Sequence, residues 1–353
     1  MVIWADDTAT YAGQAFARGG AEGGDGGFVE TSGHQVLNVR STARVNTLAT
    51  KGIAGQWLLD PNDIEITTAS VSTIPGASRI DPSVLITALA SGNVSVTTTG
   101  GTYGGTGGVG DILIVSAISY SSSYTLTFTA DNDVSVYAGV SNAGTGQIVL
   151  SASHDILINS GGSISAAGAA NGVITLSALH NFTNSSGSST AVSAPNGRWV
   201  IYSASPWGDT FGGLTSGDYA EWNGTMSTKS VADLEEEDAF GDGATGKYVF
   251  SVQPTITISL SDDSKTYGDA ASLGSGDYTL SGAVTNTYGN VYLADTTDVL
   301  SGSVSVGSSG STTTATVGSY DITATTGGVT MARGYGVTVS NTATLEVEKR
   351  TLT

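Results

Sequence analysis

Three stretches of this sequence have the same form and recur at nearly constant spacing. They read LTFTADNDV (126–134), IVLSASHDI (148–156) and ITLSALHNF (174–182), so their starts lie 22 and then 26 residues apart. Each stretch joins an alternating apolar strand to a polar corner and then to a second apolar strand. A period in the low twenties with two or three short strands is typical of one coil of a parallel β-solenoid. The sequence therefore predicts a stack of such coils.

The same form extends towards the N-terminus of the chain. WLLDPNDIEI (57–66) matches it, and LITALASGNVSV (85–96) matches more loosely. At a strand spacing of ~4.8 Å, roughly eight coils in the first 200 residues would form a stack of about 40 Å. Gly and Asn suit the corners because they tolerate positive φ. The Gly-rich stretch 97–111 is predicted to be a loop or an irregular coil between regular ones.

Stacking of these windows would place their corner residues in two neighbouring ladders. In a functional interpretation the ladders form a metal-binding or proton-relay row. In a structural interpretation they are corner side chains bonded to the backbone of adjacent coils, which is favoured because the histidines lack a clear third ligand and an acidic cage. The first ladder consists of Asp133, Asp155 and Asn181, with Asp63 as a candidate fourth member, and the second consists of Asn132, His154 and His180.

Composition narrows the classes of function. Charged residues make up only 12% of the chain and Gly counts 49, so few windows supply the residues of a long amphipathic helix, whereas 39% hydrophobic residues suffice for a core. The net charge of −19, with no Lys or Arg between Arg79 and Arg198, argues against binding of nucleic acid or anionic membrane. Cysteine is absent, which excludes disulfides and thiol chemistry. No apolar run reaches the ~18 residues of a membrane span, so no membrane insertion is expected.

A resemblance adds to this reading. GGDGG (23–27), FVETSG (28–33) and GQWLLDPNDI (55–64) occur in fixed order. They resemble the end of the conserved core of two-partner secretion exoproteins, the filamentous haemagglutinin-like adhesins. The resemblance implies a right-handed parallel β-helix, export through an outer-membrane transporter barrel, and a secreted or cell-surface location. The secretion-signal domain would lie upstream of Met1. We assign the solenoid to residues 1–203.

A capping and connecting segment is predicted over residues 204–253. Residues 197–225 carry three of the five Trp and resemble the aromatic segment that follows the solenoid in these exoproteins. Those aromatics are expected to pack as a cap, because an uncapped coil exposes core and sheet edge. The acidic run that follows offers hard oxygen ligands for Ca²⁺, although a solvated loop or short helix explains it more simply. The candidate calcium ligands are Asp233, Glu235, Glu237, Asp238 and Asp242.

Residues 254–350 are predicted to form an immunoglobulin-like β-sandwich of about seven strands. SKTYGD (264–269), GSYDIT (318–323) and NTATLEVEKRTLT (341–353) resemble the MBG-type ("YDG") repeats of bacterial surface adhesins. Because that module commonly recurs in tandem, residues 351–353 would begin the next copy. The family label refers to mucin binding, but these residues display no glycan pocket.

Catalytic patterns are missing from the solenoid windows. Lyases of this shape need an Arg or Lys base, and residues 80–197 contain neither. Asp131 and Asp133 form the only close acidic pair in the regular coils, and corner structure explains them better than glycoside hydrolysis does. Exposed aromatic rings that stack on sugars are an alternative source of binding. The candidate glycan-binding residues are Tyr103, Tyr120, Tyr124 and Tyr137.

We therefore expect a non-enzymatic spacer from a large secreted bacterial surface adhesin that attaches to a host, a matrix or a biofilm. No cofactor is expected apart from the candidate Ca²⁺, and the receptor would be a glycan or a protein. Two alternatives stay open. One is a carbohydrate-binding or carbohydrate-active β-helix, and the other is a self-assembling extracellular filament or matrix protein.

Overall fold

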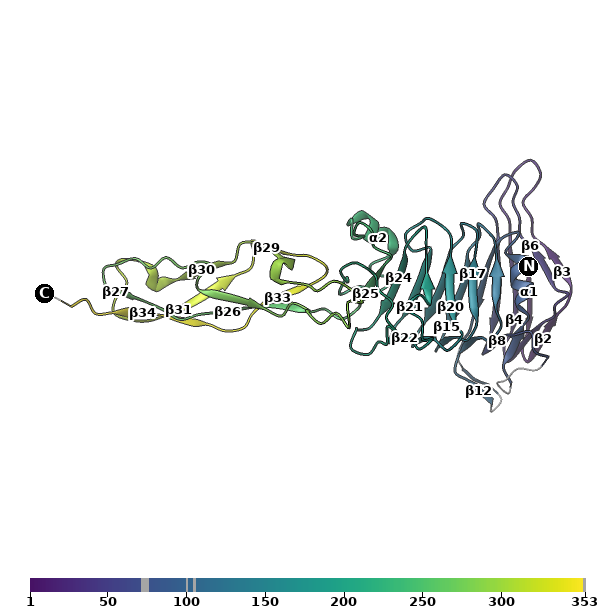
Figure 1. The fold of residues 1–353 in the computed structure, drawn as a ribbon, viewed down its shortest axis with the longest axis horizontal. Coiled ribbons are helices and arrows are strands. Elements are labelled where there is room, and N and C mark those ends of the chain that lie inside the picture. The colour runs from purple at the N-terminus through teal and green to yellow at the C-terminus, as the bar shows by residue number, and fades with distance from the viewer. Residues whose placement is uncertain (71–75, 100, 104–105, 352–353) are drawn as a thin grey trace. The chain divides into compact units, whose positions relative to one another are not determined.

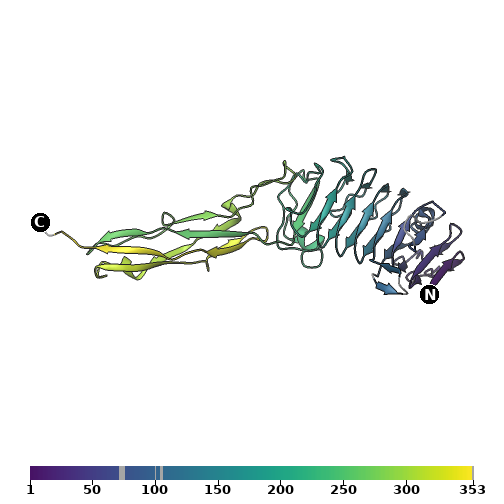
Figure 2. The ribbon, with the colours of Figure 1, turned by 90° about the horizontal axis from the view of Figure 1, so that it is seen from below.

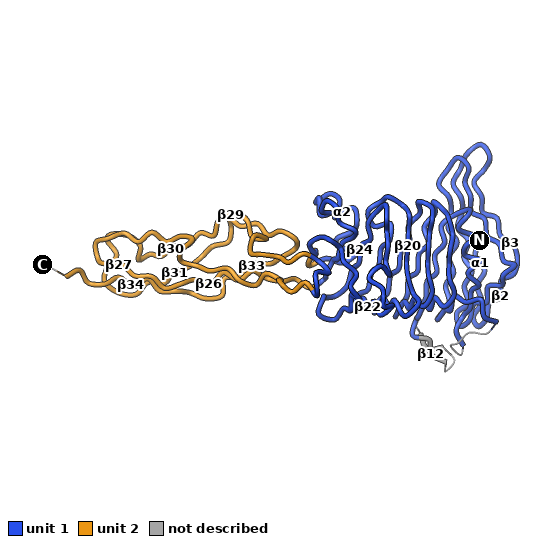
Figure 3. Tube along the Cα trace, viewed as in Figure 1, with its two compact units in different colours: residues 1–220, 224–251, 288–292 blue, residues 221–223, 252–287, 293–353 orange. Residues whose placement is uncertain are grey.

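The structure is a computed structural model that describes residues 1–70, 76–99, 101–103 and 106–351, with the backbone alone at 101–103 and 106–108. Strands account for 41% of the chain and helices for 6%, which confirms the prediction of an all-β fold. The chain forms two compact units (Figure 3). Unit 1 consists of residues 1–220, 224–251 and 288–292, and unit 2 consists of residues 221–223, 252–287 and 293–353.

The first face of unit 1 is a nine-stranded sheet in which every neighbouring pair is parallel (Figures 1 and 2). The chain leaves this face after each strand and returns to it one coil later. Eight of the strands lie within the first 203 residues, in agreement with the predicted number of coils. In sheet order they are β1 (Val2–Ala5), β4 (Phe28–Gly33), β7 (Gln56–Pro61), β10 (Asn93–Thr97), β15 (Leu126–Ala130), β18 (Ile148–Ala152), β21 (Ile174–Ala178), β24 (Trp199–Ser203) and β25 (Gly246–Phe250).

The second face of unit 1 is an eight-stranded sheet, also parallel throughout. A parallel sheet on each face and a chain that winds from one face to the next define a β-helix-like fold. The strands, in sheet order, are β2 (Thr8–Tyr11), β5 (Val36–Val39), β9 (Ser78–Ile80), β8 (Ile64–Ile66), β13 (Ile112–Ile114), β16 (Val134–Val136), β19 (Ile156–Ile158) and β22 (Phe182–Asn184).

The third face of unit 1 is divided into two short parallel sheets. One sheet belongs to the first two coils, and the other begins only after β10. The first sheet pairs β3 (Gln14–Phe16) with β6 (Arg44–Asn46), and the second contains β14 (Ile118–Tyr120), β17 (Gly139–Asn142), β20 (Ser163–Ala166) and β23 (Val192–Ser193).

The register of the coils is the one that the sequence windows predict. Leu126 pairs with Ile148, and Ile148 pairs with Ile174, so equivalent window positions lie side by side. Alternate apolar positions of these strands point inwards and are buried, while the intervening residues of β15 and β18, which are Thr, Ser and Val149, are partly exposed. Burial of each apolar side chain contributes roughly 1.5–3 kcal/mol, which makes these columns the main source of stability in unit 1.

One predicted coil contains a helix where a strand was expected. Part of the window 85–96 belongs to α1 (Pro82–Ala88), which lies beside both β6 and β14 and so takes the place of a third-face strand. The Asp81 carboxylate caps the helix by accepting the backbone N–H of Ser83, and Pro82 occupies the first turn. Asp followed by Pro is a helix-start signal, and it outweighs the apolar pattern that favoured a strand.

The Gly-rich stretch 97–111 leaves the regular coil, as predicted. It contains an antiparallel hairpin of β11 (Gly101–Tyr103) and β12 (Thr106–Gly108), between β10 and β13.

The end of unit 1 is covered by aromatic side chains and a short helix. Strand β25 extends the first sheet beyond residue 203, and α2 (Val231–Glu236) packs Leu234 against Val200, Tyr202 and Val249. Trp207 is 58% exposed and takes no part, so the prediction of cap packing is wrong for this residue. The rings in edge-on or tilted contact on the other side of β24 and β25 are those of Trp199, Phe211, Tyr248, Phe250, Tyr288 and Tyr292.

Unit 2 contains two larger sheets that share a core. Leu260 from one sheet packs against Ile322, Ala343 and Leu345 from the other. Unlike the sheets of unit 1, these mix parallel and antiparallel pairs. The first sheet orders β28 (Tyr278–Ser281), β26 (Thr255–Leu260) and β33 (Gly336–Val339), and the second orders β27 (Asp263–Thr266), β34 (Ala343–Glu348), β31 (Gly318–Thr325) and β30 (Ser305–Ser308). A further antiparallel pair joins β29 (Leu300–Gly302) to β32 (Val329–Met331). Unit 2 also contains two short 3₁₀ helices, η1 (Thr297–Val299) and η2 (Ser309–Ser311).

The unit boundaries differ from the predicted segments at three places, the smallest of which is residues 252–253, which we assigned to the cap but which belong to unit 2. Residues 288–292, which we assigned to the second module, belong to unit 1 and supply two rings to its aromatic cover. Residues 221–223, which we assigned to the cap, belong to unit 2, where the indole of Trp222 donates to Asp295 at 3.0 Å.

Candidate functional site

A row of aspartates runs along unit 1 at the corner that precedes the second face. We call it the corner ladder, and it consists of Asp63, Asp111, Asp133, Asp155 and Asn181. The Oδ1 atom of each aspartate accepts the backbone N–H of the next ladder residue, over distances of 2.9, 3.2, 2.9 and 2.8 Å along the row. The carboxylates therefore satisfy backbone donors that leave the strand ladders at the corners.

The corner ladder confirms the predicted stacking and adds one member. Asp133, Asp155 and Asn181 lie in register, and Asp63 joins the same row as expected. Asp111 was missed, because the Gly-rich insertion before it hides the repeat. The sequence signal is an aspartate directly before the alternating strand ILI, in the same place as Asp133 before VSV.

The residues that precede the corner ladder form a second row, which turns towards it. The Asn132 amide donates to the Asp111 carboxylate at 2.8 Å. His154 Nδ1 lies 2.8 Å from Asp133 Oδ1, and His180 Nδ1 lies 2.9 Å from Asp155 Oδ1, so each side chain contacts the carboxylate of the preceding coil. The corner ladder therefore matches the structural interpretation of side chains bonded to the backbone, whereas the second row bonds to carboxylates instead.

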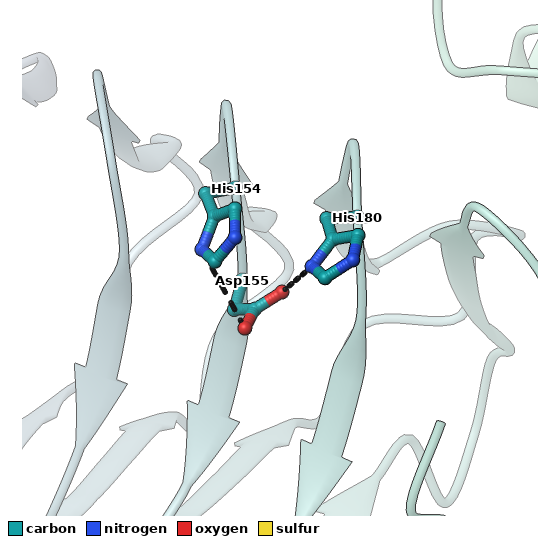
Figure 4. A group of neighbouring side chains, drawn as sticks. All are labelled: His154, Asp155 and His180. Atoms are coloured by element: carbon teal, nitrogen blue, oxygen red, sulfur yellow. Dashed lines mark hydrogen bonds and ion pairs between the residues drawn. The ribbon is translucent and has the colours of Figure 1, made fainter. Parts of the chain in front are cut away.

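The two imidazoles also lie against each other (Figure 4). Their ring centroids are 4.6 Å apart and their planes are inclined by 20°. Asp155 lies between the two histidines, because its Oδ2 atom is 3.5 Å from His154 Nδ1 while its Oδ1 atom contacts His180. The imidazoles are 49% and 54% exposed, whereas the Asp155 side chain is 19% exposed. A half-buried carboxylate thus holds two rings that face solvent.

The carboxylates change the protonation of one of these rings. The hydrogen bond to Asp133 raises the pKa of the His154 imidazole, and the charges of Asp155, Asp133 and Asp111 act in the same direction. Burial acts in the opposite direction but is outweighed by these effects. His154 therefore holds its proton more tightly than an isolated histidine does.

Asp209 is a further carboxylate near this row that the sequence did not indicate. Its Oδ1 atom accepts the backbone N–H of Phe182 at 2.8 Å, and its Oδ2 atom accepts the Ser203 hydroxyl at 2.6 Å. Burial raises the pKa of Asp209 to about 7, and the negative charge of Asp155 adds to the rise. The group is a partly buried acid that changes charge near neutral pH.

Three of the five predicted calcium ligands are engaged with neighbouring groups. Asp233 forms a capping box with Ser230 at the start of α2, which lowers the pKa of its carboxyl. The Glu235 carboxylate accepts the Asn171 amide at 3.0 Å, and Glu237 pairs with Lys229 at 2.7 Å. The acidic run thus contains the short helix that we considered as the simpler explanation.

The other two predicted calcium ligands lie after this helix. Asp238 has a positive φ of 52°, and Asp242 is exposed. Calcium binding by the acidic run stays a prediction.

The four predicted glycan-binding tyrosines differ in what they present to solvent. Tyr120 is only 7% exposed, and burial raises the pKa of its phenol, so its ring offers little face to a sugar. Tyr137 is 44% exposed and Tyr124 is partly buried. The side chain of Tyr103 lies outside the described residues. Glycan binding by this group stays a prediction.

Within the part of the chain that the structure describes, one set of three metal-ligating side chains comes together, namely His154, Asp155 and His180. Their ligand atoms all lie within 4.8 Å of one another. Asp155 is the third ligand that the sequence windows did not reveal, because it approaches the two histidines only when adjacent coils stack.

Comparison of the chain with protein-family models, with curated proteins and with solved structures finds no match. Neither of the two α-helices in the described ranges has the length and apolar character that a membrane crossing requires.

Proposed function

We propose that this chain is a spacer segment of a secreted bacterial surface adhesin. The observation that carries the proposal is the nine-stranded sheet of unit 1, in which every coil is bonded to the next in parallel register. Extension along the stack would have to break whole rows of strand hydrogen bonds together. Such a stack gives reach and stiffness, while receptor contacts lie in loops or in other parts of the protein.

The resemblance to two-partner secretion exoproteins supports an extracellular role. FVETSG coincides with β4, and GQWLLDPNDI contains β7, so both motifs are coils of the stack. We propose export through an outer-membrane transporter barrel, followed by folding outside the cell. A chain without cysteine suits this route, since it needs no oxidation to fold.

We further propose that the solenoid is right-handed and that unit 2 is an immunoglobulin-like module of the MBG type. Connections between parallel strands of one sheet are right-handed in about 98% of proteins, because of the twist of the strands. For unit 2, the support is a core shared by two sheets, together with the matches at 264–269 and 318–323.

The spacer function is tested by pulling on the chain between its ends in an optical trap. The regular coils that begin at β15, β18 and β21 are 22 to 26 residues long, so each of these coils should lengthen the tether by roughly 70–90 Å when it unravels. A series of such steps is the expected result. Unfolding of unit 1 in a single event at low force would contradict a load-bearing stack.

A second experiment separates a spacer from the two rival functions. Incubation with acidic polysaccharides should give no shortened products, and a glycan array should give no signal from residues 1–251. Light scattering should report a monomer at all concentrations. Cleavage or glycan capture would identify a carbohydrate-directed β-helix, and growth of the particles with concentration would identify a self-assembling filament.

A further inference from the structure

We propose that His154, Asp155 and His180 form a binding site for a divalent transition-metal ion, with Zn²⁺ as its representative. The three residues come from corners of two adjacent coils and meet at the surface of unit 1 (Figure 4). The proposal is independent of the spacer function, since it depends only on this cluster.

The distances suit a small ion with few ligands. A tetrahedral zinc ion with ligands at ~2.0–2.1 Å holds its ligand atoms about 3.3 Å apart. Asp155 Oδ2 and His154 Nδ1 are 3.5 Å apart, and Asp155 Oδ1 and His180 Nδ1 are 2.9 Å apart. The remaining imidazole–imidazole pair lies within 4.8 Å. Zinc binding would require the two half-exposed rings to rotate about their side-chain bonds and shorten this distance.

The carboxylate at the centre is already held in position by the backbone. Asp155 Oδ1 accepts the Asn181 N–H at 2.8 Å, and strand pairing fixes the spacing of the coils that carry the histidines. A ligand held by rigid strands and by a second hydrogen bond loses little freedom when an ion binds. Asp133 Oδ1 lies 2.8 Å from His154 Nδ1 and is therefore placed to serve as a fourth ligand.

The donor set selects the class of ion. Imidazole nitrogens suit Zn²⁺, Cu²⁺ and Ni²⁺, whereas Ca²⁺ and Mg²⁺ prefer oxygen ligands alone. The surroundings favour any cation, because residues 80–197 contain no Lys or Arg and the net charge is −19. The combination of two imidazoles with one carboxylate therefore points to a zinc-type ion rather than to calcium.

The chain provides its own matched variant for the test. Asn132 occupies the histidine position one coil earlier and donates to the Asp111 carboxylate. His154→Asn and His180→Asn therefore introduce, at the histidine positions, a residue that the equivalent position one coil before His154 already contains. Both variants should fold as the natural chain does. Because the chain has only three histidines, His34→Asn is the control for non-specific imidazole binding.

Calorimetric titration of the full chain with ZnCl₂ at neutral pH measures the affinity. We expect one zinc ion per chain, and a loss of affinity of at least ~10-fold for His154→Asn and for His180→Asn, the lower limit for disturbing even an outer partner of a ligand. His34→Asn should bind as the natural chain does. Excess Ca²⁺ should leave zinc binding unchanged. Imidazole NMR signals of His154 and His180 should shift with zinc, and those of His34 should not.

Three results would overturn the proposal. One is zinc binding by the His154→Asn/His180→Asn double variant with the affinity of the natural chain. Another is displacement of zinc by Ca²⁺, which would indicate an all-oxygen site elsewhere. The third is a folded natural chain that takes up no zinc in the calorimeter.

Discussion

The two units make cores from similar residues in different ways. In unit 1 each buried side chain lies on its counterpart one coil away, as in the column of Val134, Ile156 and Phe182, all fully buried. In unit 2 two strand pairs, β26 with β33 and β27 with β34, join its beginning to its end, as where Thr255 pairs with Gly336. A short repeat thus gives local, self-similar contacts, whereas the second unit depends on long-range pairing. The comparison predicts that damage to one unit leaves the other folded.

Each unit also contains a buried ion pair, and the two pairs differ in exposure. The Lys247 and Asp218 side chains in unit 1 are 1% and 6% exposed, and their charged atoms are 2.7 Å apart. Asp295 in unit 2 is fully buried, but its partner Arg333 is 27% exposed. Water therefore screens the second pair more than the first.

Lys247→Met should give the largest effect. It leaves the Asp218 carboxylate buried without its cation, which costs about 3–5 kcal/mol. Arg333→Met should cost less, because Arg333 is itself partly exposed and the Tyr335 hydroxyl and the Trp222 indole still donate to Asp295. Chemical denaturation of both variants measures the difference. Equal losses would mean that exposure does not separate the two pairs.

Core truncation tests whether the two units unfold separately. Leu150 in β18 and Leu345 in β34 are both fully buried, and either change to Ala should cost about 2–5 kcal/mol. Leu150→Ala should lower only the unit 1 transition in calorimetry, and Leu345→Ala only the unit 2 transition. A single transition that shifts in both variants would refute two independent cores.

Asp209 should make the stability of unit 1, and not that of unit 2, depend on pH. Burial raises the pKa of Asp209 to about 7, whereas an unfolded aspartate titrates near ~3.9. Between these values the folded chain keeps a proton that the unfolded chain has released, so stability falls as pH rises towards 7 and stays lower above it.

Asp209→Asn should remove this dependence. Its amide oxygen still accepts the Phe182 N–H, so the variant should match the natural chain at pH 4 and exceed its stability at pH 8 by on the order of 2 kcal/mol. Thermal unfolding at the two pH values measures this. A variant that is less stable at pH 8 would show that the ionised carboxylate is needed.

The smallest effect should be confined to the corner ladder. Asp133→Asn keeps an oxygen for the Asp155 N–H but loses the charge that raises the pKa of His154. The His154 pKa should fall towards its ordinary value with little change in stability. NMR titration of the imidazole C–H signals reports it, and His34 serves as the unaffected internal control. An unchanged His154 pKa would mean that Asp133 is not its cause.

Periodicity explains how much of the fold was predictable. Where the repeat is uninterrupted, equivalent residues of successive repeats are strand partners. The register of β15, β18 and β21 follows directly from that alignment. Where an insertion interrupts the repeat, prediction failed: α1 was read as a strand, and Asp111 was overlooked. In unit 2 no repeat exists, so the sequence indicated short strands but not which of them pair.

The candidate metal site was predictable only in part. The two histidines occupy the same window position, so their stacking followed from the repeat. Asp155 as a shared third ligand did not follow, because its distance to each ring depends on side-chain direction and coil spacing. The raised pKa of Asp209 could not be predicted from the sequence either, because its burial comes from a loop without any repeat signal.

Helix α1 has a consequence for how unit 1 comes apart. Because it replaces a strand, the described residues form no continuous hydrogen-bond ladder on the third face between β6 and β14. In a linear array of coupled elements, disorder spreads from neighbour to neighbour through their shared interface. Fraying that starts in the first two coils therefore meets a break in the hydrogen-bond ladder on this face. Beyond that break, the later coils keep their own sheet.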